Sequence, residues 1–340
     1  MKLRLLLLCI SGLLAAVVAS AGAEHVWRDG EWVEVGEPTE AGTSEAATRM
    51  RRHLADGEPG EAVDIGEEFL DENAEDPRRE EVMVLLGRAE MDEGDYFDAF
   101  ERFEAYLGEY PNGKYIERAL QREYEIGVAF LEGRKRRVLA VLSVPGAPDG
   151  VDILERVIEH APQSRVASEA MLRLGDFRLS RGQHNLAVET YDQYLKMFPR
   201  SKRAAEVMLK AARATYESYE GPEHGDTPLI EAEQRFRHFA ERYPDRARAE
   251  GVPGTLEQIA ELRAGKLIET AEFYRRVGRD EAAVYYYRNT VKRYPDTGSA
   301  EKARRMLDGM GVPVEEPEED APTTRPADAG AEPEQESETE

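Results

Sequence analysis

Four stretches of the chain decide its fold. They read FDAFERFEAYLGEYP (97–111), NLAVETYDQYLKMFP (185–199), IEAEQRFRHFAERYP (230–244) and EAAVYYYRNTVKRYP (281–295). In each stretch an alanine is followed four residues later by an aromatic residue, and eight residues after that by a proline that itself follows an aromatic residue. These positions are Ala99, Phe103 and Pro111; Ala187, Tyr191 and Pro199; Ala232, Phe236 and Pro244; and Ala283, Tyr287 and Pro295. Such self-similarity is the signature of a repeat architecture.

Each of these positions has a role in a pair of packed helices. Residues i and i+4 lie on one face of a helix, so the alanine lets a neighbouring helix approach and the ring fills the space beside it. Proline lacks the N–H that would continue the helix, so each helix ends before it. In three of the four stretches another small residue lies twelve positions before the alanine, namely Gly87, Gly175 and Ala271. This spacing is typical of a tetratricopeptide repeat.

We therefore expect an all-α protein, a tetratricopeptide-repeat solenoid of about six helix pairs over residues 43–310. Residues 60–77 and 151–164 look like weaker units, and the second of them has lost the alanine and the aromatic residue. Residues 298–309 are expected to form a closing helix.

Two insertions, residues 133–150 and 220–228, interrupt the repeats. We expect them to form loops, where repeat proteins often meet their partners. The first insertion contains the one dense basic cluster of the chain, residues 134–137.

Residues 1–23 are expected to be a signal peptide. A short basic segment is followed by an apolar run and by the small residues Ala21-Gly22-Ala23, so cleavage is predicted between Ala23 and Glu24. The alternative is an uncleaved anchor, because the apolar run approaches the length that spans a bilayer. Cys9 lies inside the apolar run without a small residue before it, so we do not expect lipidation.

Both tryptophans lie in residues 24–42, an extended segment in which Asp29-Gly30 predicts a hairpin with Trp27 opposite Trp32. Packing against the first helices is expected for this hairpin, and a binding flap is the alternative. Residues 311–340 are expected to be a disordered acidic tail. From residue 315 onward the tail has eleven acidic residues, one basic residue and no large apolar side chain. We expect it to be a solubilising extension, with a docking arm as the alternative.

The chain has 340 residues and a net charge of −24. A charge of this sign argues against general nucleic-acid binding and against adhesion of the folded part to an anionic lipid surface. The single cysteine excludes a disulfide framework, and the six histidines have no zinc-binding spacing. No nucleotide-binding or nucleophile motif is found. We therefore expect a protein that is not an enzyme and that has no catalytic, metal or cofactor-binding residues.

Three aromatic residues are candidates for a surface that faces a partner. Tyr285, Tyr286 and Tyr287 are consecutive, and consecutive positions on a helix point in different directions. Since Tyr287 belongs to the repeat pattern, only Tyr285 or Tyr286 is free to face a partner. The residues that bind a partner are otherwise not identified by the sequence.

Residues 226–303 resemble the C-terminal half of BamD, the outer-membrane assembly factor. The resemblance is carried by Asp226-Thr227, Tyr243-Pro244, the helix end AEFYRRVG (271–278), Ala282-Ala283 and YPDT (294–297). Residues 80–201 resemble the middle of that family more loosely.

The resemblance implies a non-catalytic periplasmic protein at the inner face of the outer membrane. Its implied partners are the barrel insertase and unfolded outer-membrane protein precursors. Without a lipidation cysteine in the usual place, contact with the membrane is expected to be indirect, through partners. One alternative is a YbgF-type periplasmic scaffold that links cell-wall synthesis or division to the envelope, although no heptad run is present. The other is the repeat superhelix of a lytic transglycosylase, which needs a separate catalytic domain.

Overall fold

The computed structural model describes residues 24–28, 31–35, 44–139 and 142–314. The predicted signal peptide and nearly all of the predicted acidic tail lie outside these residues. The chain divides into two compact units between Phe177 and Arg178, inside helix α7 (Arg165–Ser180).

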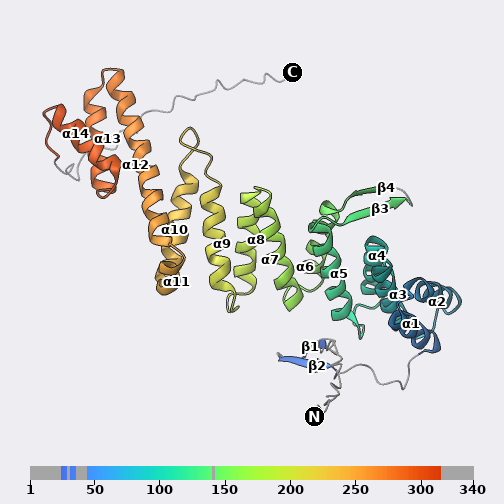
Figure 1. The fold of residues 1–340 in the computed structure, drawn as a ribbon. Coiled ribbons are helices and arrows are strands. Elements are labelled where there is room, and N and C mark those ends of the chain that lie inside the picture. The colour runs from blue at the N-terminus through green and yellow to red at the C-terminus, as the bar shows by residue number, and fades with distance from the viewer. Residues whose placement is uncertain (1–23, 29–30, 36–43, 140–141, 315–340) are drawn as a thin grey trace, which may run out of the picture. The chain divides into compact units, whose positions relative to one another are not determined.

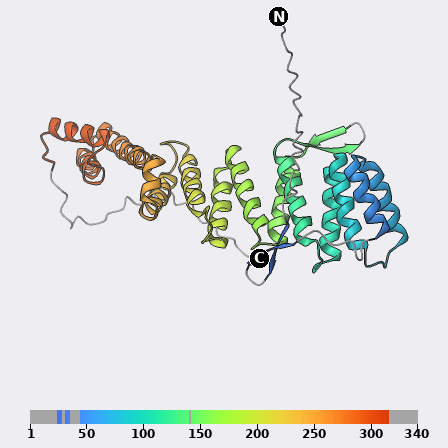
Figure 2. The same cartoon turned by 60° about the horizontal axis from the view of Figure 1, so that its bottom comes forward.

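The first unit contains six complete helices and two short hairpins (Figure 1). Its elements are β1 (Glu24–Arg28), β2 (Glu31–Val35), α1 (Glu45–Asp56), α2 (Pro59–Glu72), α3 (Arg79–Glu93), α4 (Tyr96–Glu109), α5 (Ile116–Leu131), β3 (Lys135–Leu139), β4 (Leu142–Pro145) and α6 (Ala147–His160). Each helix from α1 to α5 packs against the next one, and α1 also contacts α3, as α3 contacts α5. Figure 2 shows α1 to α4 side by side.

The second unit contains the remaining helices. They are α8 (His184–Met197), α9 (Ala204–Glu217), α10 (Thr227–Arg242), α11 (Pro244–Ala249), α12 (Val252–Arg276), α13 (Asp280–Arg293) and α14 (Gly298–Gly309). Here α9 packs between α8 and α10, and α12 packs against α10, α13 and α14. The predicted closing helix is confirmed with the predicted bounds, as α14. Helix α11 was not predicted, because Pro244 both ends α10 and begins α11.

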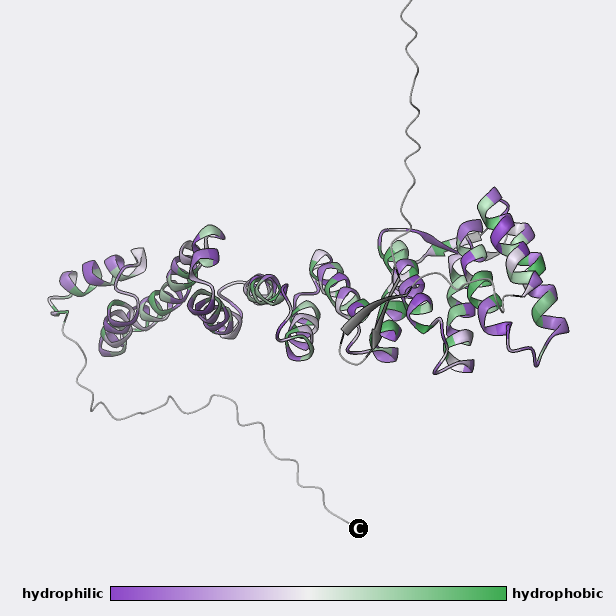
Figure 3. Ribbon diagram, turned by 90° about the horizontal axis from the view of Figure 1, so that it is seen from below, coloured by the Kyte–Doolittle hydropathy of each residue, from purple (hydrophilic) through white to green (hydrophobic). Residues whose placement is uncertain are grey.

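The all-α tetratricopeptide-repeat fold predicted from the sequence is confirmed. In chain order the helices form six pairs, α1/α2, α3/α4, α5/α6, α7/α8, α9/α10 and α12/α13, of which the first helix is called helix A and the second helix B. Figure 3 shows that the helices carry both hydrophilic and hydrophobic residues. The hydrophobic residues are buried between neighbouring helices, as expected for amphipathic helices that stack.

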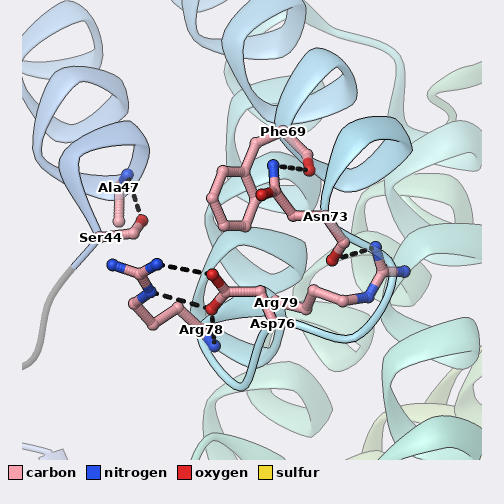
Figure 4. A network of polar contacts seen from close by, with 7 residues as sticks. All are labelled: Ser44, Ala47, Phe69, Asn73, Asp76, Arg78 and Arg79. Atoms are coloured by element: carbon pink, nitrogen blue, oxygen red, sulfur yellow. Dashed lines mark hydrogen bonds and ion pairs between the residues drawn. The ribbon is translucent and has the colours of Figure 1, made fainter.

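Polar contacts fix the ends of the first helices (Figure 4). The Ser44 hydroxyl caps α1, since it accepts a hydrogen bond from the Ala47 backbone N–H at 2.9 Å. In the turn between α2 and α3, the Arg78 guanidinium donates two hydrogen bonds to the Asp76 carboxylate, at 2.9 and 2.6 Å. These bonds hold the pKa of Asp76 down at about 2. The turn between two repeats is thus defined by local side-chain contacts.

The first hairpin has the predicted register. Strands β1 and β2 are antiparallel, and Trp27 is the register partner of Trp32. The second hairpin differs from the prediction. Residues 133–150 were expected to form a loop, but they contain the antiparallel strands β3 and β4 and the first residues of α6. The hairpin is inserted between helix A and helix B of one repeat, and in Figures 1 and 2 it lies across the ends of α4 and α5.

The repeat that contains this hairpin keeps the repeat pattern in altered form. Gly150 takes the alanine position and Leu154 takes the position of the aromatic residue four later; both are buried. Gly127 is the small residue of the preceding helix, and a Cβ placed on Gly150 would lie 2.8 Å from the Gly127 carbonyl oxygen. The alanine and the aromatic residue are absent from this unit, as expected, and Gly150 and Leu154 fill their positions. Two glycines let α5 and α6 approach along their backbones.

Candidate functional site

The residues of the repeat pattern lie in the core. The four alanines and Ala271 are fully buried, and the four rings are at most 1% exposed. Gly87 and Gly175 are also buried, whereas the four prolines lie exposed at helix ends. A Cβ added to Gly87 would lie 2.8 Å from Cζ of Phe103, so helix A must be this close to the ring of helix B. With their side chains buried, these small residues and rings form the scaffold and do not contribute to a binding surface.

The position three residues after the small residue differs from repeat to repeat. In α3 and α4 this position holds Glu90 and Arg102, whose Oε1 and Nη2 are 3.1 Å apart. In the repeat that begins with α7 it holds Arg178 and Thr190, joined by a hydrogen bond of 2.7 Å. In α12 and α13 it holds Tyr274 and Tyr286. The repeat pattern therefore leaves one facing pair per repeat free to vary in chemistry.

Four aromatic rings of α12 and α13 form a continuous series. Tyr274 and Tyr286 stack with their planes 10° apart and their centroids 5.5 Å apart. Phe273 meets Tyr274 edge-on at 5.6 Å, and Tyr285 meets Tyr286 edge-on at 5.4 Å. We call these four residues, together with Val277, the aromatic patch.

The outer members of the aromatic patch are open to solvent. Phe273 and Tyr285 are 51% exposed and Val277 is 53% exposed. They are three of the seven large apolar side chains that are exposed in the described part of the chain. Scattered exposed apolar residues are ordinary, but a contiguous group of rings marks an interaction surface.

Local sequence explains how the patch is assembled. Phe273 and Val277 are one helical turn apart, so they lie on one face of the end of α12. Gly278 has φ of +72°, a left-handed conformation that glycine adopts without strain, and it turns the chain into α13. The Arg279 N–H donates to the Tyr274 carbonyl at 2.9 Å and closes this turn. The sequence indicated Tyr285 and Tyr286, but it did not show that Phe273 and Tyr274 join them.

Four arginines are neighbours of the aromatic patch in sequence: Arg275, Arg276, Arg279 and Arg288. Within the described residues none of these four forms an ion pair. Arg275 contacts the Met306 sulfur at 3.8 Å, and Arg288 donates from Nη2 to the Pro313 carbonyl at 3.0 Å. The first turn of α13 adds two acidic residues, Asp280 and Glu281. The surface is therefore aromatic and cationic on a chain whose net charge is −24.

A second candidate is a groove between α8, α9 and α10. It has a volume of about 250 Å³, and its apolar lining includes Leu195 and Met208. Arg235, His238 and Arg242 supply its polar lining. The Arg235 guanidinium is already bound by both carboxylate oxygens of Asp192, at 2.7 Å each. Asp192 thus occupies Arg235, and Arg242 is the arginine of this lining that can bind a ligand.

The basic cluster at residues 134–137 is engaged within the first unit. The guanidinium carbon of Arg134 lies 3.8 Å from the centroid of the Tyr96 ring, and that of Arg136 lies 3.3 Å from the centroid of Phe97. Arg137 pairs with Asp95 at 2.6 Å. These contacts fasten the β3–β4 hairpin to the start of α4. The cluster thus has a structural role that the sequence did not reveal.

Among the described residues, no group of three or more histidine, cysteine, aspartate or glutamate side chains is arranged to hold a metal ion. Nor does any helix in this part of the chain combine the length and the hydropathy that crossing a bilayer requires.

Comparison with solved structures finds chains of low sequence identity. A crystal structure of MamA is 20% identical, covers 60% of this chain and 95% of its own, and has a TM-score of 0.35. A tetratricopeptide repeat protein from Parabacteroides merdae is 12% identical, with 78% and 96% coverage and a TM-score of 0.35. MamA from Desulfovibrio magneticus is 18% identical, with 58% and 96% coverage and a TM-score of 0.33. No curated protein matches the chain.

Two family models match the sequence. Residues 81–113, which include α3 and α4, match a tetratricopeptide repeat. Residues 147–309, from the first residue of α6 to the last residue of α14, match YfiO, described as an outer membrane lipoprotein. The match includes the aromatic patch and the groove, and it confirms the resemblance to BamD. The matches over residues 147–309 and 81–113 are thus consistent with a BamD-like tetratricopeptide-repeat protein.

Proposed function

We propose that this chain is a BamD-like, non-catalytic component of the outer-membrane barrel assembly machinery. In this role it binds the barrel insertase and unfolded outer-membrane protein precursors. The observation that carries the proposal is the aromatic patch, a solvent-exposed group of rings within the residues that match the outer membrane lipoprotein family. The proposal assigns no catalytic residue and requires no cofactor.

The aromatic patch is the proposed docking surface for the insertase. Aromatic residues and arginine are enriched at the energetic centres of protein interfaces, because large rings bury much apolar area and lose little conformational entropy. Phe273 and Tyr285 present such rings, and Tyr274 and Tyr286 support them from below through ring contacts. A partner that covers the two exposed rings would gain apolar burial without rearranging the patch.

The groove between α8 and α10 is the proposed site for a precursor segment. Leu195 and Met208 offer apolar surface for an aromatic side chain, and methionine adapts to varied shapes. Arg242 lies on the same groove and can pair with a carboxylate. A barrel precursor that exposes aromatic residues near its C-terminal carboxylate has this combination of groups.

The proposed location is the periplasm, at the inner face of the outer membrane. Attachment would come through the insertase rather than through a lipid. The YfiO family is described as lipoproteins. Since Cys9 lies outside the described residues, the absence of lipidation in this chain stays a prediction.

Depletion of the protein in cells tests the function. We expect folded outer-membrane barrel proteins to fall several-fold on depletion, and the insertase to copurify with the full chain. Re-expression of the wild-type chain should restore both. Normal barrel-protein levels after depletion would contradict the proposal, and normal levels combined with a defect in division or cell-wall synthesis would favour the YbgF-type scaffold instead.

A matched pair of variants localises the function. The double variant Phe273→Ala/Tyr285→Ala removes the exposed rings of the aromatic patch and should fail to restore barrel-protein levels. Leu262→Ala is the control, because Leu262 is a 39% exposed apolar residue on the same helix, outside the patch. Equal rescue by both variants would show that the patch is not the docking surface.

A further inference from the structure

The described chain ends beside the aromatic patch. After α14, residues 310–314 return to α13. Met310 and Val312 pack in the same core cluster as Tyr274 and Tyr286. The Arg288 guanidinium donates from Nη2 to the Pro313 carbonyl at 3.0 Å. Because Arg288 is three residues from Tyr285, Pro313 is bound about one helical turn from the exposed ring.

One polar group at this point has no partner. The Nε–H of Arg288 is buried, and no acceptor binds it among the described residues. A buried donor without an acceptor costs free energy, and a guanidinium is suited to bind a carboxylate with two of its N–H groups at once. This donor belongs to the same guanidinium that binds the Pro313 carbonyl, one residue before the last described residue, Val314.

The sequence that follows has the chemistry that this surface lacks. Residues 315–322 read EEPEEDAP, with five carboxylates and two prolines in eight residues. Clusters of arginine bind acidic segments, and proline-rich segments bind surfaces lined by aromatic rings. The aromatic patch offers both kinds of group. Its sequence neighbours include four arginines and only two acidic residues, Asp280 and Glu281, and two of its rings are exposed.

The segment is also within reach. Eight extended residues span up to about 28 Å, which is several times the pitch of one helical turn. A tether of so few residues gives an effective concentration on the order of millimolar, so even a weak contact is populated.

We propose that residues 315–322 of the acidic tail bind the aromatic patch of their own chain, with carboxylates on Arg288 and the other arginines of the patch and prolines on Phe273 and Tyr285. Given the proposed function, the tail then competes with the insertase for this surface and weakens their association. The tail serves as a docking arm rather than only as a solubilising extension.

Photocrosslinking within the isolated full chain tests this contact without any partner. A photoreactive p-benzoylphenylalanine replaces Tyr285, and the crosslinked peptides are identified by mass spectrometry. We expect crosslinks to residues 315–322 in the monomer, and a several-fold lower yield at high salt. No crosslink to the tail would overturn the proposal. Crosslinks between two copies would also overturn it, because they would make the patch a self-association surface.

Two charge-matched variants of the tail complete the test. One replaces the five acidic residues of 315–320 by glutamine or asparagine, and the other replaces the five glutamates of 332–340 by glutamine. The first should lower the crosslink yield several-fold, and the second should leave it unchanged. Equal yields from both would overturn the proposal.

A binding measurement then separates the two parts of the inference. With the insertase added, the first tail variant should bind about threefold to tenfold more tightly than the wild type. Unchanged affinity with an intact crosslink would overturn the competition but not the contact. Absence of any insertase binding would contradict the proposed function, whereas the intramolecular crosslink would still report on the tail.

Discussion

The repeats α3/α4 and α12/α13 place different chemistry at the same position. Three residues after the small residue, the first repeat has Glu90 facing Arg102, and Glu90 is only 6% exposed. The second repeat has Tyr274 stacked on Tyr286, with further rings reaching into solvent. Both pairs lie between helices whose approach is set by small residues and a buried ring at equivalent positions of the repeat. One repeat uses the position for a buried ion pair, and the other uses it to support an exposed surface.

This difference separates two kinds of residue in the chain. The small residues and rings of the repeat pattern determine how helix A and helix B pack, so changing them should affect stability in every repeat. The facing pair three residues later does not determine the packing, so it can be charged, hydroxylic or aromatic. Binding surfaces arise where this variable pair extends into exposed residues. We expect substitutions to divide along the same line.

The largest expected effect comes from comparing two aromatic residues, one from each repeat. Phe103→Ala removes a ring that is fully buried in α4, so the free energy of unfolding should fall by about 3–5 kcal/mol. Tyr285→Ala removes a ring that is 51% exposed in α13, and should change it by less than about 0.5 kcal/mol. Denaturant unfolding followed by circular dichroism measures both. Similar losses in the two variants would mean that the aromatic patch is part of the core.

The second-largest expected effect is on the pH dependence of stability, and it comes from the ionisation of Glu90 beside Arg102. Burial raises the pKa of Glu90 to about 7 from its ordinary 4.5, although Arg102 acts in the opposite direction. Because the folded chain binds this proton more tightly than the unfolded chain, the stability it contributes is complete below pH 4.5. It is lost as the pH rises through about 7.

Glu90→Gln removes this dependence. Relative to the variant, the wild type should lose on the order of 2 kcal/mol between pH 5 and pH 8, since one pKa unit corresponds to about 1.4 kcal/mol. Denaturant unfolding at a series of pH values measures the difference. Glu93→Gln, at an exposed position of the same helix, is the control and should run parallel to the wild type. If the free energy of unfolding of Glu90→Gln also changed with pH in parallel with that of the wild type, the effect of burial on the pKa of Glu90 would be refuted.

The smallest effect comes from adding one methyl group to either repeat. Gly87→Ala places a Cβ 2.8 Å from a carbon of the buried Phe103 ring, so we expect a loss of about 1–2 kcal/mol despite the better helix propensity of alanine. Gly265→Ala in α12 meets its nearest neighbouring atom at 3.8 Å and should gain about 0.5–1 kcal/mol. Thermal unfolding compares the two variants. A gain in both would show that the ring beside Gly87 yields easily.

The sequence predicted the repeats wherever the pattern kept its aromatic residue. It identified the helix pairs around Ala99, Ala187, Ala232 and Ala283, and it gave the bounds of α14. It did not identify Gly150 and Leu154 as members of the pattern, because leucine can fill the space of an aromatic ring without carrying its signature. Sequence periodicity alone cannot distinguish such a replacement from the loss of a repeat.

The candidate site was predicted only in part. Tyr285 and Tyr286 were noticed because they are adjacent in sequence, whereas Phe273 and Tyr274 reach them only through the turn at Gly278. The basic cluster at residues 134–137 suggested a surface for partners. Its arginines instead pack on Tyr96 and Phe97, and contacts between segments about forty residues apart leave no local sequence signal.

Binding of the insertase tests the central claim most directly. The dissociation constant of its purified periplasmic domain is measured by calorimetry for the full wild-type chain, for Phe273→Ala/Tyr285→Ala and for Leu262→Ala. The double variant should bind at least about tenfold more weakly, since losing two hot-spot rings costs upwards of 1.4 kcal/mol, while Leu262→Ala binds as the wild type does. Equal affinity for all three chains would contradict the claim that the aromatic patch is the docking surface.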